Sequence, residues 1–317
     1  MVVLQQMIVF FVMMVLGVVL RRARIVTEDN QRELSSLVMN VACPALVISG
    51  AASATERIPP LDLAFCFGVF VAMLAFMALI GSLLPLLLHY PKAEHGAVNL
   101  MFVETNVSFI GLPLISNAYG PDAAFYMVLF LIPAGFFLYS YAIAVISKRA
   151  DGAPAPQQGF ARKAAAFARQ LANPGMAACV IALALYLGGV ELPYVLAEPV
   201  SMVGDLSAPL AMILIGASFA DIKPRELFCD VRLNLFILLK MLIIPIVAML
   251  ALKQVIGNEY LLITCMVNLS APTVSMAAML ALLYNKDRYL LITRAVALTT
   301  LVSVATMPIV SLVCGIG

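Results

Sequence analysis

Apolar runs of about twenty residues recur along almost the whole chain, and they limit its fold more than any other feature. Hydrophobic residues make up 63% of the 317 residues and charged residues 11%, whereas soluble domains carry about 25% charged residues. A helix needs roughly 20 apolar residues to cross a bilayer, and lipid offers no partner for unpaired backbone groups. The alternating pattern of a membrane barrel is absent from the sequence. We therefore predict an all-α integral membrane protein.

The apolar runs and the breaks between them predict ten transmembrane spans. Residue 148 to residue 172 form the longest stretch between spans, and this stretch divides the spans five and five. We expect a first repeat at 1–147, a cytoplasmic linker at 148–172 and a second repeat at 173–317. The predicted spans are residues 2–20, 33–51, 61–88, 97–117, 121–147, 173–190, 198–220, 233–254, 259–282 and 288–315.

Basic residues gather on one side of the predicted membrane. Alternate loops collect fifteen Lys and Arg residues, whereas the other loops hold only Arg57 and Lys253. Because cytoplasmic loops are rich in Lys and Arg, both termini are predicted to lie outside the cytoplasm, with the protein in the cell (plasma or inner) membrane. The small net charge of +2 predicts no nucleic-acid partner. The fifteen are Arg21, Arg22, Arg24, Arg32, Lys92, Lys148, Arg149, Arg162, Lys163, Arg169, Lys223, Arg225, Arg232, Lys286 and Arg288.

The two halves of the chain resemble each other at a constant offset of 165 residues. Residues 40–53 (NVACPALVISGAAS) align with residues 205–218 (DLSAPLAMILIGAS), and the same offset pairs Tyr119 with Tyr284. Five spans in each half make the second half enter the membrane from the opposite side. The halves are therefore predicted to be inverted repeats, an arrangement typical of secondary transporters.

Two predicted spans carry polar residues beside a proline in mid-membrane: VETNVSFIGLPLISNAYG (103–120) and VNLSAPTVSMAAML (267–280). Proline removes an amide donor and displaces the carbonyl four residues earlier, so freed carbonyls can bind a cation. The half-helix that follows favours an anion at its N-terminus. A plain proline kink is the alternative for one segment, but two such segments favour a binding site. The candidate binding residues are Thr105, Asn106, Ser108, Gly111, Pro113, Asn268, Ser270, Pro272, Thr273 and Ser275.

Four ionisable residues fall within spans, where charge is costly, so each is a functional candidate. Glu104 is the preferred coupling residue, because a carboxyl group in apolar surroundings can bind and release a proton. A permanent ion pair of Glu104 with Lys240 or Arg294 is an equal alternative. Lys240 and Arg294 could supply positive charge for a carboxylate substrate, although Arg294 could instead extend to the cytoplasmic surface. Asp205 aligns with Asn40, so a polar packing role is favoured.

The residues of the first break also resemble a known family. TNVSFIGLPLISNAYG resembles the fourth-helix crossover of the auxin efflux carrier (PIN-like) family, in which an Asn is followed five residues later by Gly and seven residues later by Pro. Asn106, Gly111 and Pro113 hold those places. SAPTVSMAAMLALLYNKDRYLLITRAVALTTLVSVATMP resembles the ninth and tenth helices of the family, and NVACPALVISG resembles the second.

This resemblance implies a ten-helix carrier with the NhaA-like or bile-acid-symporter-like architecture. Helices 1, 2, 6 and 7 would form a scaffold and the other six a mobile transport domain, with helices 4 and 9 crossing at their prolines beside the substrate. Family members move auxin in plants, and bacterial relatives are associated with small carboxylates such as malonate and malate. Many plant carriers have a long hydrophilic loop where this chain has 148–172. A bacterial-type member is therefore expected, and auxin is the less expected substrate.

These features predict a secondary transporter that moves a small organic anion by alternating access, with a carboxylate as the expected substrate. Transport would be uniport or coupled to H⁺ or Na⁺, without a cofactor or metal, and a homodimer is expected in the lipid bilayer. A channel-like facilitator and a transporter-like sensor are alternatives. An enzyme is not expected, because the two histidines, His89 and His95, share one loop and no catalytic motif occurs. The scattered cysteines are predicted to be packing residues.

Overall fold

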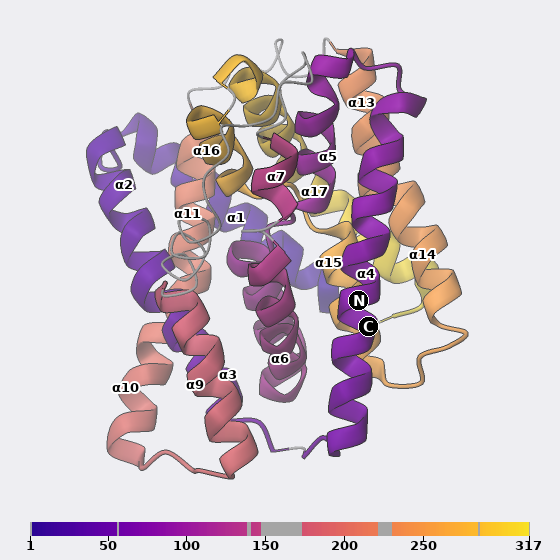
Figure 1. The fold of residues 1–317 in the computed structure, drawn as a ribbon. Coiled ribbons are helices and arrows are strands. Elements are labelled where there is room, and N and C mark those ends of the chain that lie inside the picture. The colour runs from indigo at the N-terminus through magenta and orange to yellow at the C-terminus, as the bar shows by residue number, and fades with distance from the viewer. Residues whose placement is uncertain are drawn as a thin grey trace, which may run out of the picture.

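The computed structural model describes residues 2–55, 57–137, 141–146, 173–220, 230–284 and 286–316, which form a bundle of helices (Figure 1). The predicted linker 148–172 and Cys229 lie outside the described residues. The first half contains α1 (Val2–Arg22), α2 (Glu28–Leu37), η1 (Val38–Ala42), α3 (Cys43–Ala52), α4 (Pro60–Leu87), η2 (Lys92–Glu94), α5 (His95–Val103), η3 (Val107–Gly111), α6 (Leu112–Phe137) and α7 (Ile143–Ile146). The second half contains α9 (Pro174–Gly188), α10 (Tyr194–Asp205), α11 (Ser207–Phe219), α13 (Val231–Leu238), η5 (Leu239–Ile243), α14 (Ile244–Leu252), α15 (Glu259–Ser270), α16 (Ser275–Tyr284), η6 (Lys286–Arg288) and α17 (Tyr289–Cys314).

The prediction of an all-α membrane protein is confirmed, and helices make up most of the described part of each predicted span. The number of spans and their inverted relation stay predictions. Two apolar helices, Pro174–Gly188 and Glu259–Ser270, are shorter than the seven helices named next. Within the described residues, seven helices are long and apolar enough to cross a membrane: Val2–Arg22, Glu28–Ala52, Pro60–Leu87, Val107–Phe137, Tyr194–Phe219, Val231–Leu252 and Tyr289–Cys314.

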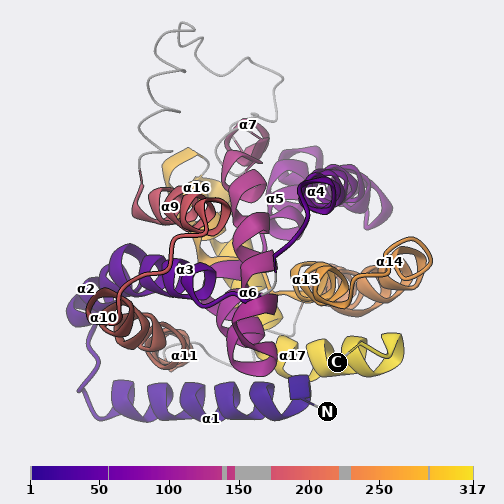
Figure 2. The ribbon, with the colours of Figure 1, turned by 90° about the horizontal axis from the view of Figure 1, so that it is seen from below.

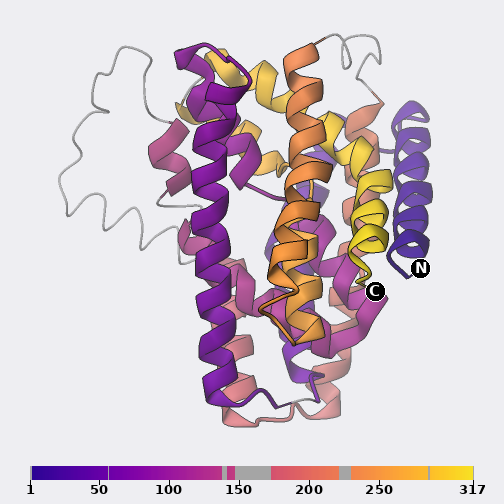
Figure 3. The same cartoon turned by 90° about the vertical axis from the view of Figure 1, so that its right-hand side faces the viewer.

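The helix α6 lies in the centre of the bundle. Figure 2 shows α2, α3, α10 and α11 on one side of α6, and α4, α14, α15 and α17 on the other. In Figure 3 the chain termini lie close together, at the ends of α1 and α17, which contact each other. Residues 261–270 of α15 are all buried, whereas α1 and α4 expose apolar side chains such as Val12 and Leu79. These outer faces are suited to contact lipid.

Three π-helical turns each end two residues before a proline. The turns η1, η3 and η5 precede Pro44, Pro113 and Pro245 respectively, and each is closed by an N–H that donates to the carbonyl five residues earlier. A proline cannot donate to the helix and its ring crowds the carbonyl four residues before it. The wider turn accommodates that carbonyl, so the helix continues through the proline.

The first predicted broken span ends where α6 contains a real backbone break, at Gly120. Its φ of 84° and ψ of −175° lie outside the helical region, and residues with a Cβ rarely adopt such a positive φ. The predicted boundary between the spans 97–117 and 121–147 therefore coincides with a change of chain direction.

Two glycines allow α1 and α11 to approach each other closely. A Cβ atom on Gly216 would lie 2.0 Å from the carbonyl oxygen of Met14, and one on Gly17 would lie 2.1 Å from the carbonyl oxygen of Ile213. No real Cβ atom tolerates such a distance, so each glycine accepts the backbone of the other helix. Small residues at a helix interface are a common means of packing membrane helices.

We expect Gly216→Ala to lower the free energy of unfolding by about 1–3 kcal/mol, because the added methyl group forces the two backbones apart. Thermal unfolding in detergent, followed by size-exclusion chromatography, measures the effect. Gly68→Ala is the matched control, since a Cβ on Gly68 would meet nothing within 4 Å. Equal melting temperatures for the two variants would contradict the close packing of α1 against α11.

Candidate functional site

Two interrupted helices meet at the centre of the bundle. The first break lies between Val103, the last residue of α5, and Val107, the first of η3. The second lies between Ser270, the last residue of α15, and Ser275, the first of α16. We call these two breaks, residues 104–106 and 271–274, the crossover. Thr105 and Thr273 pair across it in an antiparallel bridge.

Backbone groups freed by one break are hydrogen-bonded to those freed by the other. The Asn106 N–H donates to the Pro272 carbonyl at 2.7 Å, and the Val274 N–H donates to the Glu104 carbonyl at 3.0 Å. Unpaired peptide groups are costly where water is scarce, so this exchange stabilises both breaks together.

The first break does not lie at the proline predicted to cause it. Pro113 is buried inside α6, seven residues beyond Asn106, and the π turn η3 carries the helix through it. The expectation that Pro113 sits at the crossing point is therefore wrong, because the wider turn heals the local disruption. Pro272, in contrast, lies within the second break and its carbonyl takes part in the crossover.

The side chain of Lys240 binds the end of α5. Its Nζ donates to the carbonyls of Met101 and Phe102, each at 2.8 Å, and lies 5.6 Å from the centre of the Phe102 ring. Lys240 is 1% exposed. A cation at a helix C-terminus satisfies free carbonyls and the helix dipole at once. The carbonyls of Met101 and Phe102 are thus satisfied by an ammonium group of the protein.

The polar side chains at the crossover mostly bind backbone. Thr273 donates from its hydroxyl to the Met101 carbonyl at 2.6 Å, and its N–H donates to the Thr299 hydroxyl at 3.1 Å. Asn106 caps the next half-helix by accepting from the Phe109 N–H at 3.2 Å. Asn268 donates to the Thr264 carbonyl at 2.8 Å, whereas its side-chain oxygen has no partner in the described part of the chain. These contacts stabilise the crossover.

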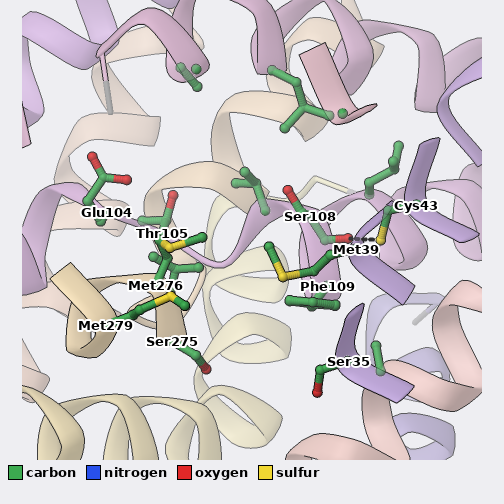
Figure 4. A pocket seen from close by; sticks show the side chains of 18 of the residues that line it. Ser35, Met39, Cys43, Glu104, Thr105, Ser108, Phe109, Ser275, Met276 and Met279 are labelled. Carbon is green, nitrogen blue, oxygen red and sulfur yellow. Dashed lines mark hydrogen bonds between the residues drawn. The ribbon is translucent and has the colours of Figure 1, made fainter. Parts of the chain in front are cut away.

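A cavity of about 550 Å³ adjoins the crossover (Figure 4). Glu104 and Thr105 line it from the first break, and Ser108 and Phe109 line it from η3. Ser275, Met276 and Met279 of α16 line it from the second interrupted helix. Much of the remaining wall is apolar and comes from α3, α6, α9 and α11. The cavity is therefore an apolar chamber with a small polar region at the crossover.

The first turns of both half-helices present free amide groups at this polar region. Among the described residues, the N–H groups of Ser108, Ser275 and Met276 have no acceptor, and neither serine hydroxyl has a hydrogen-bond partner. All three residues line the cavity. Unpaired amides and the positive ends of two helix dipoles favour a negatively charged group at this position.

The structure brings some of the predicted residues to the cavity and keeps others from it. Thr105, Ser108, Ser275 and Glu104 line the cavity. Gly111 instead packs against Met127 and Val267. Whether any of the predicted residues binds substrate stays a prediction. The predicted residues that do not line the cavity are Asn106, Gly111, Pro113, Asn268, Ser270, Pro272, Thr273, Lys240, Arg294 and Asp205.

Three of the four charged candidates lie away from the cavity. Arg294 is exposed and lines a separate cleft with Tyr90 and Asp230. Asp205 is exposed at the end of α10. Lys240 is bound to α5 and forms no ion pair with Glu104 within 4.0 Å. The structure therefore shows no direct ion pair of Glu104 with Lys240 or Arg294.

The sequence did not indicate several polar residues of the cavity wall. Gln31 and Ser35 of α2 and Asn40 of η1 line the cavity, together with Asn173 and Thr300. Gln31 and Ser35 are four residues apart and so lie on one face of α2. That polar face was the available signal, but it is also typical of an ordinary amphipathic helix.

Broken helices that meet beside a cavity are typical of the membrane transporter class. The family model described as membrane transport protein, the auxin efflux carrier family, matches residues 2–311. This match covers nearly the whole chain, so the protein belongs to that family and is a multi-pass membrane transporter. The PIN-like resemblance predicted from the sequence is thereby confirmed. No curated protein matches the chain.

We expect Lys240→Met to lower the free energy of unfolding by about 1–3 kcal/mol, because the buried Phe102 carbonyl loses its side-chain donor. Lys253→Met is the matched control. The Lys253 Nζ also donates to a backbone carbonyl, that of Cys314 at 2.5 Å, but this lysine is exposed. Unfolding of both variants in detergent measures the difference. Equal losses would show that Lys240 does not stabilise the crossover.

Proposed function

We propose that this transporter carries a small organic acid, as its carboxylate, across the membrane by alternating access. The proposal is based on the cavity at the crossover, where free amides and hydroxyls of two half-helices face one space. An anion at this position gains hydrogen bonds and two favourable helix dipoles. Met39, Phe109, Met276 and Met279 contribute apolar wall. The rest of a small acid would lie against this wall.

We infer that the cavity faces the cytoplasm in this conformation. It reaches Gln31 near the start of α2, Asn173 before α9 and Phe219 at the end of α11. These positions flank loops that carry the predicted excess of basic residues. Positive-inside topology then assigns the mouth to the cytoplasm and the termini to the outside of the cell membrane.

We further propose ten spans in two inverted repeats that move as two bodies. The helices α1, α2, α3, α9, α10 and α11 would form the scaffold, and the other helices, which contain the crossover, would form the transport domain. Contacts of α1 with α11, and of α3 with α9 and α10, support the scaffold as a packed unit. The close approach at Gly17 and Gly216 supports it further. A homodimer without a nucleic-acid partner remains our expectation for the assembly.

A ligand screen followed by a flux measurement tests this function. Purified protein is heated with benzoate, phenylacetate, malonate, malate, indole-3-acetate or amino acids, at two pH values, with and without sodium. Carboxylates are expected to raise the melting temperature, and the stabilising acid is expected to show saturable counterflow in proteoliposomes. Single-channel currents would instead indicate a channel, and stabilisation without flux would indicate a sensor. Neither stabilisation nor flux with any carboxylate would overturn the proposal.

Two substitutions of Ser275 separate its hydroxyl from its amide. Ser275→Ala removes the hydroxyl, whereas Ser275→Pro also removes the N–H at a first helical position where proline is well tolerated. Because a hydrogen bond to a charged group contributes about 1.5–3 kcal/mol, we expect the proline variant to bind the carboxylate at least about tenfold more weakly than the alanine variant. Half-saturating concentrations for counterflow measure this difference.

Ser270→Ala is the control for that comparison. Its hydroxyl donates to the Met266 carbonyl at 2.6 Å and lies outside the cavity. It should leave the half-saturating concentration unchanged. Equal affinities of Ser275→Ala and Ser275→Pro for the carboxylate would show that the Ser275 N–H does not bind it.

A further inference from the structure

Glu104 is the one charged residue that lines the cavity among the residues the structure describes. It is 9% exposed, and its carboxylate has no hydrogen-bond partner there. Its backbone is held in place on both sides, since its N–H donates to the Leu100 carbonyl and its carbonyl accepts from the Val274 N–H, each at 3.0 Å. The protein therefore holds an unpaired acid beside the amides proposed to bind the substrate.

The charged groups on the surrounding elements leave Glu104 with one electrostatic partner. Lys240 on η5, which binds the carbonyls at the end of α5, interacts electrostatically with Glu104. The helix α4 carries Asp62 only in its first turn, α17 carries Arg294 only near its start, and α15 carries Glu259 as its first residue. On α6, Asp122 accepts hydrogen bonds from Thr55. The helix α16 has no charged residue.

The Lys240 ammonium group donates to the carbonyls at the end of α5, and Lys240 does not line the cavity. With the cavity empty, a charged Lys240 would balance a charged Glu104. A carboxylate bound at the Ser108 and Ser275 amides would add a second negative charge close to Glu104, in surroundings where unbalanced charge is costly. A proton on Glu104 removes the repulsion and provides an O–H donor that faces the cavity.

We propose that Glu104 takes up one proton for each carboxylate bound, so that the protein is a symporter of an organic anion with H⁺. Lys240 acts as the fixed counter-charge. The proton enters from the solution that fills the cavity, converts the Glu104 carboxylate to the neutral acid, and leaves on the other side when the anion is released. This inference rests on the proposed function, and it adds the driving ion and the residue that binds it.

An infrared pH titration of the purified protein without substrate tests proton binding directly. The wild-type protein is expected to show a carboxylic-acid carbonyl band that disappears as the pH rises and that is missing from Glu104→Gln. Glu198→Gln makes the same chemical change at an exposed position on α10 outside the cavity and should retain the band. An identical pH-dependent band in wild type and Glu104→Gln would overturn the proposal.

A transport assay tests the coupling. In proteoliposomes with an alkaline interior, wild type is expected to accumulate labelled malonate, by up to about tenfold per pH unit for one coupled proton. Glu104→Gln resembles the protonated acid, so it should retain malonate counterflow but lose accumulation driven by the pH gradient. Accumulation that survives in Glu104→Gln, or that follows a sodium gradient and not the pH gradient, would overturn the proposal and leave the transport function standing.

A wrong substrate class would give a different experimental result from a wrong coupling residue. If no carboxylate of the screen moves through wild-type protein, the substrate class is wrong. The infrared titration still reports whether Glu104 binds a proton, because it needs no substrate.

Discussion

Peptide groups at the two helix breaks must find hydrogen-bond partners inside an apolar bundle, and the centre of the structure depends on that requirement. One break alone would leave its N–H and C=O groups unpaired. Two breaks that meet in antiparallel fashion satisfy each other, through the Asn106 N–H with the Pro272 carbonyl and the Val274 N–H with the Glu104 carbonyl. Amides that this exchange leaves free, at Ser108, Ser275 and Met276, face the cavity. The groups that stabilise the crossover and the groups proposed to bind substrate thus come from the same few residues.

The two buried charges at this centre have different surroundings. Lys240 binds the last carbonyls of α5, where a cation is favoured by the helix dipole, and it is shut off from the cavity. Glu104 is fixed by its backbone, whereas its side chain faces the cavity without a partner. A charge that already has partners suits a structural role, and a charge without them suits a role in binding. Local contacts therefore separate two residues that look alike in sequence, since each is a lone charge in an apolar span.

The two prolines of the interrupted segments have different effects on their helices. Pro113 and Pro272 both lie beside polar residues in predicted spans, and both were expected at the crossing point. Only Pro272 lies there, because the π turn η3 lets the helix continue through Pro113, as η5 does before Pro245. A proline always removes one donor, but neighbouring turns decide whether the helix breaks or widens. Sequence spacing alone does not distinguish the two outcomes.

The sequence by itself determined that the chain is helical and embedded in a membrane, which family it belongs to, and which two segments interrupt its apolar runs. Hydropathy and motif spacing are properties of short stretches, so they need no knowledge of neighbours. Only the tertiary structure decided that Glu104, Ser108 and Ser275 face the cavity and that Lys240 does not. Lys240 meets Met101 across 139 residues of chain. The surroundings of a side chain depend on which distant helices contact each other, and no local sequence pattern predicts those contacts.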